Sequence, residues 1–89
     1  MIKKQLTLIN ELGLHARASA KLVNITTRYA SDIQIARADK IINAKNIMDL
    51  MLLAASNGTE LQFMLEGEDE QEALAAIEGL IMERFGEGA

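Results

Sequence analysis

Four stretches of the chain alternate between apolar and polar positions. In residues 2–8, Ile2, Leu6 and Leu8 fall on one face, and polar side chains fall on the other, which is typical of a half-buried strand. The same alternation predicts strands over residues 32–37 and 61–65. A short strand over residues 41–43 follows a turn at Asp39 and Lys40, so it is predicted to form a hairpin with the strand before it.

Two stretches between these strands have helical character. A first helix is predicted from residue 16, with a repeat every three or four positions through Ala16, Ala20, Val23 and Thr27. A second helix is predicted to begin after Asn46, because an Asn at the N-cap with an acid three residues on, here Asp49, is a helix-start signal. It is expected to end at residues 56–58, where Gly58 would supply a left-handed cap.

A third helix follows the last strand. Asp69 is predicted to cap it, with Glu72 at the third helical position. Its apolar stripe is predicted to comprise Ala73, Ile77, Leu80, Ile81 and Phe85. Its acidic side chains, Glu70, Glu72, Glu78 and Glu83, are expected to form a solvated face without a site.

These elements follow one another in the order β-α-β-β-α-β-α. One sheet with all the helices on one face satisfies the one-sided strand patterns and two crossovers, which are expected to be right-handed. The opposite face of the sheet should then be solvated. The length of 89 residues predicts a single α+β domain over residues 1–89.

Composition narrows the chemistry. The chain has no cysteine and one histidine, which excludes a disulfide framework, a thiolate nucleophile and the common cysteine or two-histidine metal sites. We expect no metal and no cofactor. The N-terminal residues show neither a long apolar run nor a small-residue cleavage site, and no stretch approaches a membrane span, so a cytoplasmic protein is predicted.

The charge is distributed unevenly. Residues 1–59 carry eight basic and four acidic side chains, whereas residues 60–89 carry one basic and nine acidic. With a net charge of −4, the chain is a poor candidate for nucleic-acid binding. The mildly basic first part could still meet an acidic protein or a phosphate.

The segment from Gly13 to Arg17 carries the strongest chemical signal. His15 falls just before a helix, where free N–H groups and the positive end of the helix dipole converge. This position disfavours a protonated imidazole, leaves a nitrogen lone pair available, and offers donors to a phosphoryl group. Arg17 adds a positive fork for phosphate oxygens. From these residues alone, a surface histidine without a function remains an equal alternative.

The segment from Ile47 to Ala55 is apolar at every position except Asp49. A helix lying on a sheet needs only an apolar stripe, so some of these side chains are expected to form an exposed patch suited to a protein partner. The alternative is that neighbouring elements bury both sides of this helix. No paired carboxylates, Ser-His-Asp set or glycine-rich nucleotide loop stands out, so an independent enzyme is not expected.

Three stretches resemble the histidine-containing phosphocarrier (HPr) family of the bacterial phosphotransferase system. GLHARASAK at residues 13–21 is similar to the family's active-site signature, and NAKNIM with LML over residues 43–52 is similar to its second motif. DEQEALAAI at residues 69–77 resembles its third helix. The resemblance extends over essentially the whole chain and implies an open-faced β-sandwich with an antiparallel sheet in the order 1-4-2-3.

The resemblance also implies a function and its residues. His15 would accept a phosphoryl group on Nδ1 from phosphorylated Enzyme I and pass it to an enzyme IIA domain, with Arg17 balancing the charge. The backbone amides of Ala16 and Arg17 would hold phosphate oxygens. The implied docking surface comprises Ala20, Ile47, Met48 and Met51, ringed by Arg17, Lys21 and Lys45. A monomer without membrane insertion is implied, with regulatory proteins as further partners.

Three positions depart from the family pattern. Ala18 stands where many members have proline, Asp49 where glycine is common, and Asn46 where many members carry a regulatory serine. Asn46 fits either a lineage without the serine kinase or a specialised paralogue. Whether the relay ends in sugar uptake or in a regulatory branch stays open. The second hypothesis is a small regulatory module that binds a metabolite or a protein without covalent change, which would not require GLHAR.

Overall fold

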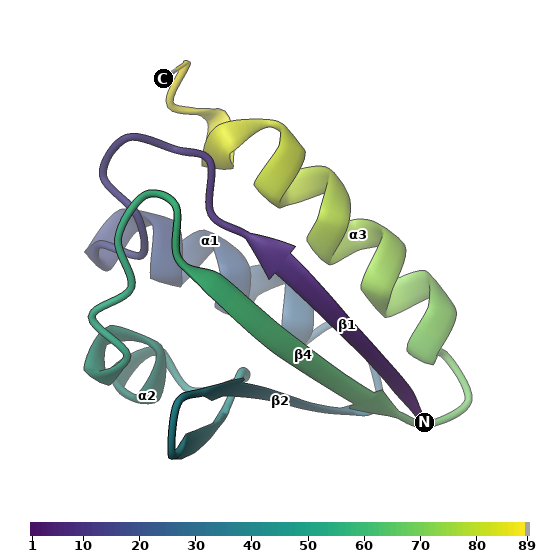
Figure 1. The fold of residues 1–89 in the computed structure, drawn as a ribbon. Helices are drawn as coiled ribbons and strands as arrows, with labels where there is room; N and C mark the ends of the chain where they lie inside the picture. Colours follow the sequence, from purple (N-terminus) through teal and green to yellow (C-terminus); the bar gives the residue numbers. More distant parts are fainter. Residues whose placement is uncertain (89) are drawn as a thin grey trace.

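The computed structural model describes residues 1–88 and shows a four-stranded antiparallel sheet with three helices (Figure 1). The strands are β1 (Ile2–Thr7), β2 (Asp32–Arg37), β3 (Lys40–Asn43) and β4 (Glu60–Glu66). The helices are α1 (Ala16–Thr26), α2 (Ile47–Leu52) and α3 (Glu70–Met82), and a 3₁₀ turn, η1, spans Arg84–Gly86. The predicted element order and the α+β class are confirmed.

The strands lie in the order β1-β4-β2-β3, as the resemblance implied. Ile2 pairs with Leu65 across β1 and β4, and Ile33 pairs with the same leucine from β2. The predicted hairpin is also present, because Ile35 of β2 pairs with Ile42 of β3. The alternating apolar positions therefore converge on one face, where α1 packs against α2 and α3 over the core.

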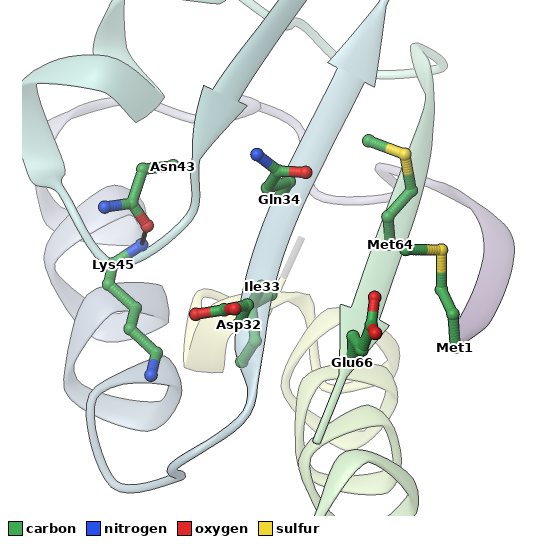
Figure 2. Close-up of a pocket in the computed structure, with 8 residues that line it drawn as sticks. All are labelled: Met1, Asp32, Ile33, Gln34, Asn43, Lys45, Met64 and Glu66. Carbon is green, nitrogen blue, oxygen red and sulfur yellow. Dashed lines mark hydrogen bonds between the residues drawn. The ribbon is translucent and has the colours of Figure 1, made fainter.

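The opposite face of the sheet carries polar side chains. Figure 2 shows a shallow hollow on it, beside the start of β1. Gln34 is exposed in this hollow, and the Nζ of Lys45 donates a hydrogen bond to the carbonyl of Tyr29, 2.7 Å away. The residues that line the hollow are Met1, Asp32, Ile33, Gln34, Asn43, Lys45, Met64 and Glu66. Asp32 is the first residue of β2, as the strand predicted over residues 32–37 requires.

The predicted start of α1 is confirmed, but the face that the helix buries is not the one marked by the repeat that begins with Ala16 and Ala20. The buried residues are Ala18, Ser19, Leu22 and Thr26, not the set that begins with Ala16 and Ala20. Two of these are polar and are accommodated by hydrogen bonds. The hydroxyl of Ser19 donates to the Leu14 carbonyl at 3.3 Å, and that of Thr26 donates to the Ala44 carbonyl at 2.9 Å. Hydropathy alone cannot identify a stripe built partly from such residues.

The end predicted for α2 was also wrong. The helix ends at Leu52, and the left-handed residue that follows is Ala54, with φ of 49°, rather than Gly58. The carbonyl of Leu53 no longer belongs to the helix and accepts a hydrogen bond from Nη1 of Arg37 at 2.5 Å. A side chain from β2 therefore satisfies a helix-end carbonyl that would otherwise need another partner.

The prediction that Asp69 caps α3 was half right. Asp69 occupies the N-cap position but makes no side-chain cap bond. Its carboxylate instead accepts bonds from the backbone N–H groups of Ala30 and Ser31, at 2.8 and 3.0 Å. Glu70 reaches back to the N–H of Gly67 at 3.0 Å. Of the predicted stripe, Ala73, Ile77 and Ile81 are buried, and Phe85 is buried in η1.

Candidate functional site

His15 lies at the N-cap of α1, where the sequence predicts it. Its backbone is extended, with φ of −74° and ψ of 179°, and its side chain makes no cap hydrogen bond. The first bond of the helix runs from the N–H of Ser19 to the His15 carbonyl, at 2.8 Å. The N–H groups of residues 16–18 therefore precede the helical ladder, and they can donate to an anion beside the imidazole.

Gly13 holds this segment against the loop between α2 and β4. Its φ is +67°, and a Cβ at this position would lie 2.4 Å from the carbonyl oxygen of Ala55. The next residue, Leu14, is buried and donates its N–H to that same oxygen at 2.9 Å. Both the backbone angle and the close approach require a glycine here. The unusual backbone expected before the histidine is confirmed.

The side-chain carboxylate of Glu87, near the C-terminal end of the chain, contacts the imidazole of His15. Nε2 of His15 lies within hydrogen-bonding distance of Oε2 of Glu87, a residue 72 positions later in the chain. The side chain of Glu87 is 14% exposed and that of His15 is 28% exposed, so this pair is partly shielded from water. The sequence analysis assigned no role to Glu87, because no local spacing connects it to His15.

Asn10 supports the other oxygen of this carboxylate. Its Nδ2 donates to Oε1 of Glu87 at 3.1 Å and to the carbonyl of Gly13 at 2.8 Å. Because both partners are acceptors, the amide nitrogen and not the amide oxygen must face them. Asn10 is fully buried, and its Oδ1 has no hydrogen-bond partner within the described residues. The network thus extends from the loop after β1 through Glu87 to His15.

These contacts keep Glu87 ionised. The hydrogen bond from His15 is the main reason that the pKa of Glu87 lies below its ordinary value. Burial opposes this, whereas the bond from Asn10 and the positive charge of Lys21 lower the pKa further. An ionised carboxylate accepts hydrogen bonds only, so the hydrogen shared with His15 belongs to Nε2.

The C-terminal turn that carries Glu87 is itself anchored. Phe85 is buried in the core, and its carbonyl accepts a hydrogen bond from Nζ of Lys21 at 2.6 Å. Arg84, Phe85 and Gly86 all have positive φ, which bends the chain back toward α1 after α3 ends. In Figure 1 this turn follows the end of α3 and lies above the loop that leaves β1.

The other residues implied in phosphate binding lie on the first turn of α1. Ala16 and Arg17 are exposed, so both are open to an incoming group. Ala20 is exposed one turn further on, and Lys21 is half-buried against η1. Lys45 is half-buried and directed to the Tyr29 carbonyl beside the hollow on the sheet.

The exposed apolar patch expected on α2 is present. Leu50 is fully buried, whereas Met48 is 66% exposed. The exposed large apolar side chains of this helix are Ile47, Met48, Met51 and Leu52. The alternative that neighbours bury both sides of this helix is therefore wrong. Leu52 was not among the expected members, although it lies within the apolar run that indicated the patch.

Neither a metal centre nor a membrane-spanning helix is found in the described part of the chain. Residues 1–88 contain no group of three or more His, Cys, Asp or Glu side chains placed to hold a metal ion. No helix among them is long and apolar enough to cross a membrane.

The fold and the site define a small α+β protein with one imidazole at a helix N-terminus and exposed apolar side chains on the next helix. A family model described as the HPr component phosphorylation site of the phosphotransferase system (PTS) matches residues 2–83. The chain belongs to the HPr family, and it is a phosphocarrier protein of the phosphotransferase system rather than an independent enzyme. The alternative of a ligand-binding regulatory module is not favoured.

Individual relatives agree with this assignment. The phosphocarrier protein HPr of Cupriavidus necator is 46% identical over 88 residues, covering 99% of each chain. That of Pseudomonas aeruginosa is 47% identical over 85 residues, covering 94% of each chain. The crystal structure of HPr-C-His from Thermoanaerobacter tengcongensis superposes with a TM-score of 0.94 at 38% identity, covering 98% of each chain.

Proposed function

We propose that Nδ1 of His15 accepts a phosphoryl group from phosphorylated Enzyme I and transfers it to an enzyme IIA domain. The observation that carries this proposal is the position of His15 at the N-cap of α1, with the imidazole partly exposed beside N–H groups that precede the helical ladder. Such a site supplies a nucleophile and an anion cradle together. No metal or cofactor is needed for this transfer.

Arg17 and two backbone amides would stabilise the transferred group. The amides of Ala16 and Arg17 belong to the first turn of α1, where N–H groups have no helical acceptor. The guanidinium of Arg17 is exposed on the same turn, so it can move onto the phosphate oxygens when they arrive. Its role is to balance charge in the transition state and in the phosphorylated product.

The apolar patch would receive both partners. Ile47, Met48 and Met51 of α2 form its centre with Ala20 of α1, a helix that packs against α2. Methionine side chains adapt to different shapes, which suits a surface that must bind a donor and an acceptor in turn. A docked partner would cover this surface, and His15 would then face the active site of the partner.

Three cations would form the rim of this surface. Arg17 is exposed, whereas Lys21 and Lys45 each donate to a backbone carbonyl. A carbonyl carries no net charge, so it does not neutralise an ammonium group, which also keeps further N–H donors. The three side chains therefore stay cationic and favour acidic partner surfaces, while the Glu87 carboxylate near Lys21 offsets part of that charge. We place the protein in the cytoplasm as a monomeric single domain over residues 1–89, with regulatory proteins as further partners.

Mass spectrometry after mixing with Enzyme I and phosphoenolpyruvate tests the proposal. One phosphoryl group should be gained and then lost in acid, since phosphohistidine is acid-labile. His15→Ala should gain none while remaining folded, because the side chain is partly exposed and fills no core space. Acid-labile phosphate on the His15→Ala variant would refute the assignment.

A further inference from the structure

We propose that Glu87 is a positioning residue for His15. Its carboxylate holds the proton on Nε2 and thereby leaves the lone pair of Nδ1 as the nucleophile. This inference deepens the proposed function and rests on it, because it names the group that selects the reacting nitrogen. The carboxylate comes from beyond α3, in a part of the chain to which the sequence analysis assigned no site.

The contact geometry carries the first step of the argument. Glu87 Oε2 faces Nε2 of His15, so the carboxylate occupies only one of the two ring nitrogens. In a neutral imidazole one nitrogen bears hydrogen and the other bears the lone pair. A carboxylate that accepts from Nε2–H therefore fixes the tautomer in which Nδ1 can attack phosphorus.

The surrounding residues hold this carboxylate in place. Asn10, which is fully buried, donates to Oε1 and leaves Oε2 for the histidine. Phe85 anchors the turn in the core, and Lys21 fixes the Phe85 carbonyl. A surface ion pair between two long flexible side chains stabilises little, because its geometry must be ordered each time it forms. Here the hydrogen bond from Asn10 and the burial of Phe85 hold the Glu87 carboxylate in position before the pair forms.

The Glu87 carboxylate would also stabilise the positive charge that develops on the His15 ring during the transfer. As Nδ1 attacks, the new P–N bond forms and the P–N bond of the donor phosphohistidine breaks. The departing donor imidazole takes the electron pair of that bond. The His15 ring then carries a positive charge, because Nε2 keeps its hydrogen while Nδ1 is bonded to phosphorus. Glu87 would stabilise this charge from the side of the ring that contacts no phosphate oxygen.

Nuclear magnetic resonance of ¹⁵N-labelled protein tests the tautomer directly. His15 is the one histidine in the chain, so all imidazole signals belong to this residue, and only its two ring nitrogens have to be distinguished. At neutral pH, the unmodified protein should show hydrogen on Nε2 with slow exchange, and a lone pair on Nδ1. Glu87→Gln and Glu87→Ala should both increase the exchange of this hydrogen and raise the share of the other tautomer.

Glu83→Gln is the matched control. It removes one negative charge from the same C-terminal region, but Glu83 is exposed and lies before η1. Its ring signals should match those of the unmodified protein. Identical exchange and nitrogen shifts in the unmodified protein and in both Glu87 variants would overturn the inference.

Single-turnover kinetics with phosphorylated Enzyme I supply the second measurement. Glu87→Gln should accept phosphate roughly tenfold more slowly, whereas Glu83→Gln should keep the original rate. Faster acceptance by Glu87→Gln would show that the carboxylate inhibits the site and would also overturn the inference. The resonance experiment needs no phosphoryl donor, so failure of the unmodified protein to accept phosphate would refute the proposed function separately.

Discussion

The carboxylate of Asp69 accepts hydrogen bonds from both the backbone N–H and the hydroxyl of Ser31, joining the start of α3 to the start of β2. The bond from the Ser31 hydroxyl is the main cause of a pKa of Asp69 below its ordinary value, and the N–H of Ala30 contributes in the same direction. The ionised form is therefore favoured by folding.

Asp69→Asn should lower stability at neutral pH and flatten its acid dependence. A carboxyl whose pKa is lowered in the folded state contributes stability above its unfolded pKa, and this contribution is lost as the pH falls through the folded pKa. The difference in unfolding free energy between the original protein and the variant should therefore shrink as the pH falls below about 4. Urea unfolding at a series of pH values measures it, with Asp39→Asn, in the exposed β2–β3 turn, as the control. A difference that does not change with pH would contradict this explanation.

Arg17→Ala should slow phosphoryl acceptance by about tenfold to a hundredfold, because it removes a charge that acts mainly in the transition state. The thermal unfolding midpoint should change little, since the side chain is exposed. Rapid-quench measurement with phosphorylated Enzyme I gives the rate. Arg28→Ala, an exposed arginine beyond the other end of α1, should transfer at the original rate. Equal rates for the two variants would remove Arg17 from the mechanism.

Met48→Asp should weaken binding to Enzyme I by about 2–4 kcal/mol if this side chain is central to the interface, because docking would desolvate a charge without a partner. Calorimetric titration measures the loss. Met82→Asp on α3 provides a control of similar exposure, at 72% against 66% for Met48. It should bind normally, because Met82 lies on a different helix from the patch. Equal weakening by both substitutions would indicate a general effect of charge instead of a docking surface.

Asn46→Ser should make the chain a substrate for the serine kinase that acts on other members of the family. Asn46 has no hydroxyl to accept phosphate, and its Oδ1 caps α2 by accepting from the N–H of Asp49 at 3.1 Å. Serine can make the same cap, whereas Asn46→Ala should lose about 1 kcal/mol of stability. Incubation with the kinase and ATP, followed by peptide mass mapping, locates any phosphate.

The unmodified chain should remain unphosphorylated in that experiment. Phosphate on a nearby hydroxyl such as Ser56 would contradict the prediction. A phosphoserine at position 46 would add about two negative charges at the edge of the docking patch and hinder an acidic partner. Asn46 brings no such charge, so the carrier should stay competent whenever Enzyme I is phosphorylated.

The N-cap residues Asn46 and Asp69 show which contacts the local sequence can predict and which it cannot. Asn46 caps α2 as predicted, because its acceptor and the N–H of Asp49 are three residues apart in one turn. Asp69 has the same kind of signal, yet its carboxylate bonds to residues 38 and 39 positions earlier in the chain. Those donors become available only when β2 lies beside the start of α3, so no local pattern could indicate them.

The amino-acid sequence by itself determined the element order, the starts of the helices, the exposed patch on α2 and the place of His15, because each depends on spacing within a few residues. Tertiary structure decided which face of α1 is buried, that Arg37 binds the carbonyl of Leu53 at the end of α2, and which side chain contacts the imidazole. Glu87 and His15 are 72 positions apart, and no local sequence pattern around either residue indicates that the two are in contact. Only the packing of Phe85 in the core and the bend of η1 bring that carboxylate to Nε2.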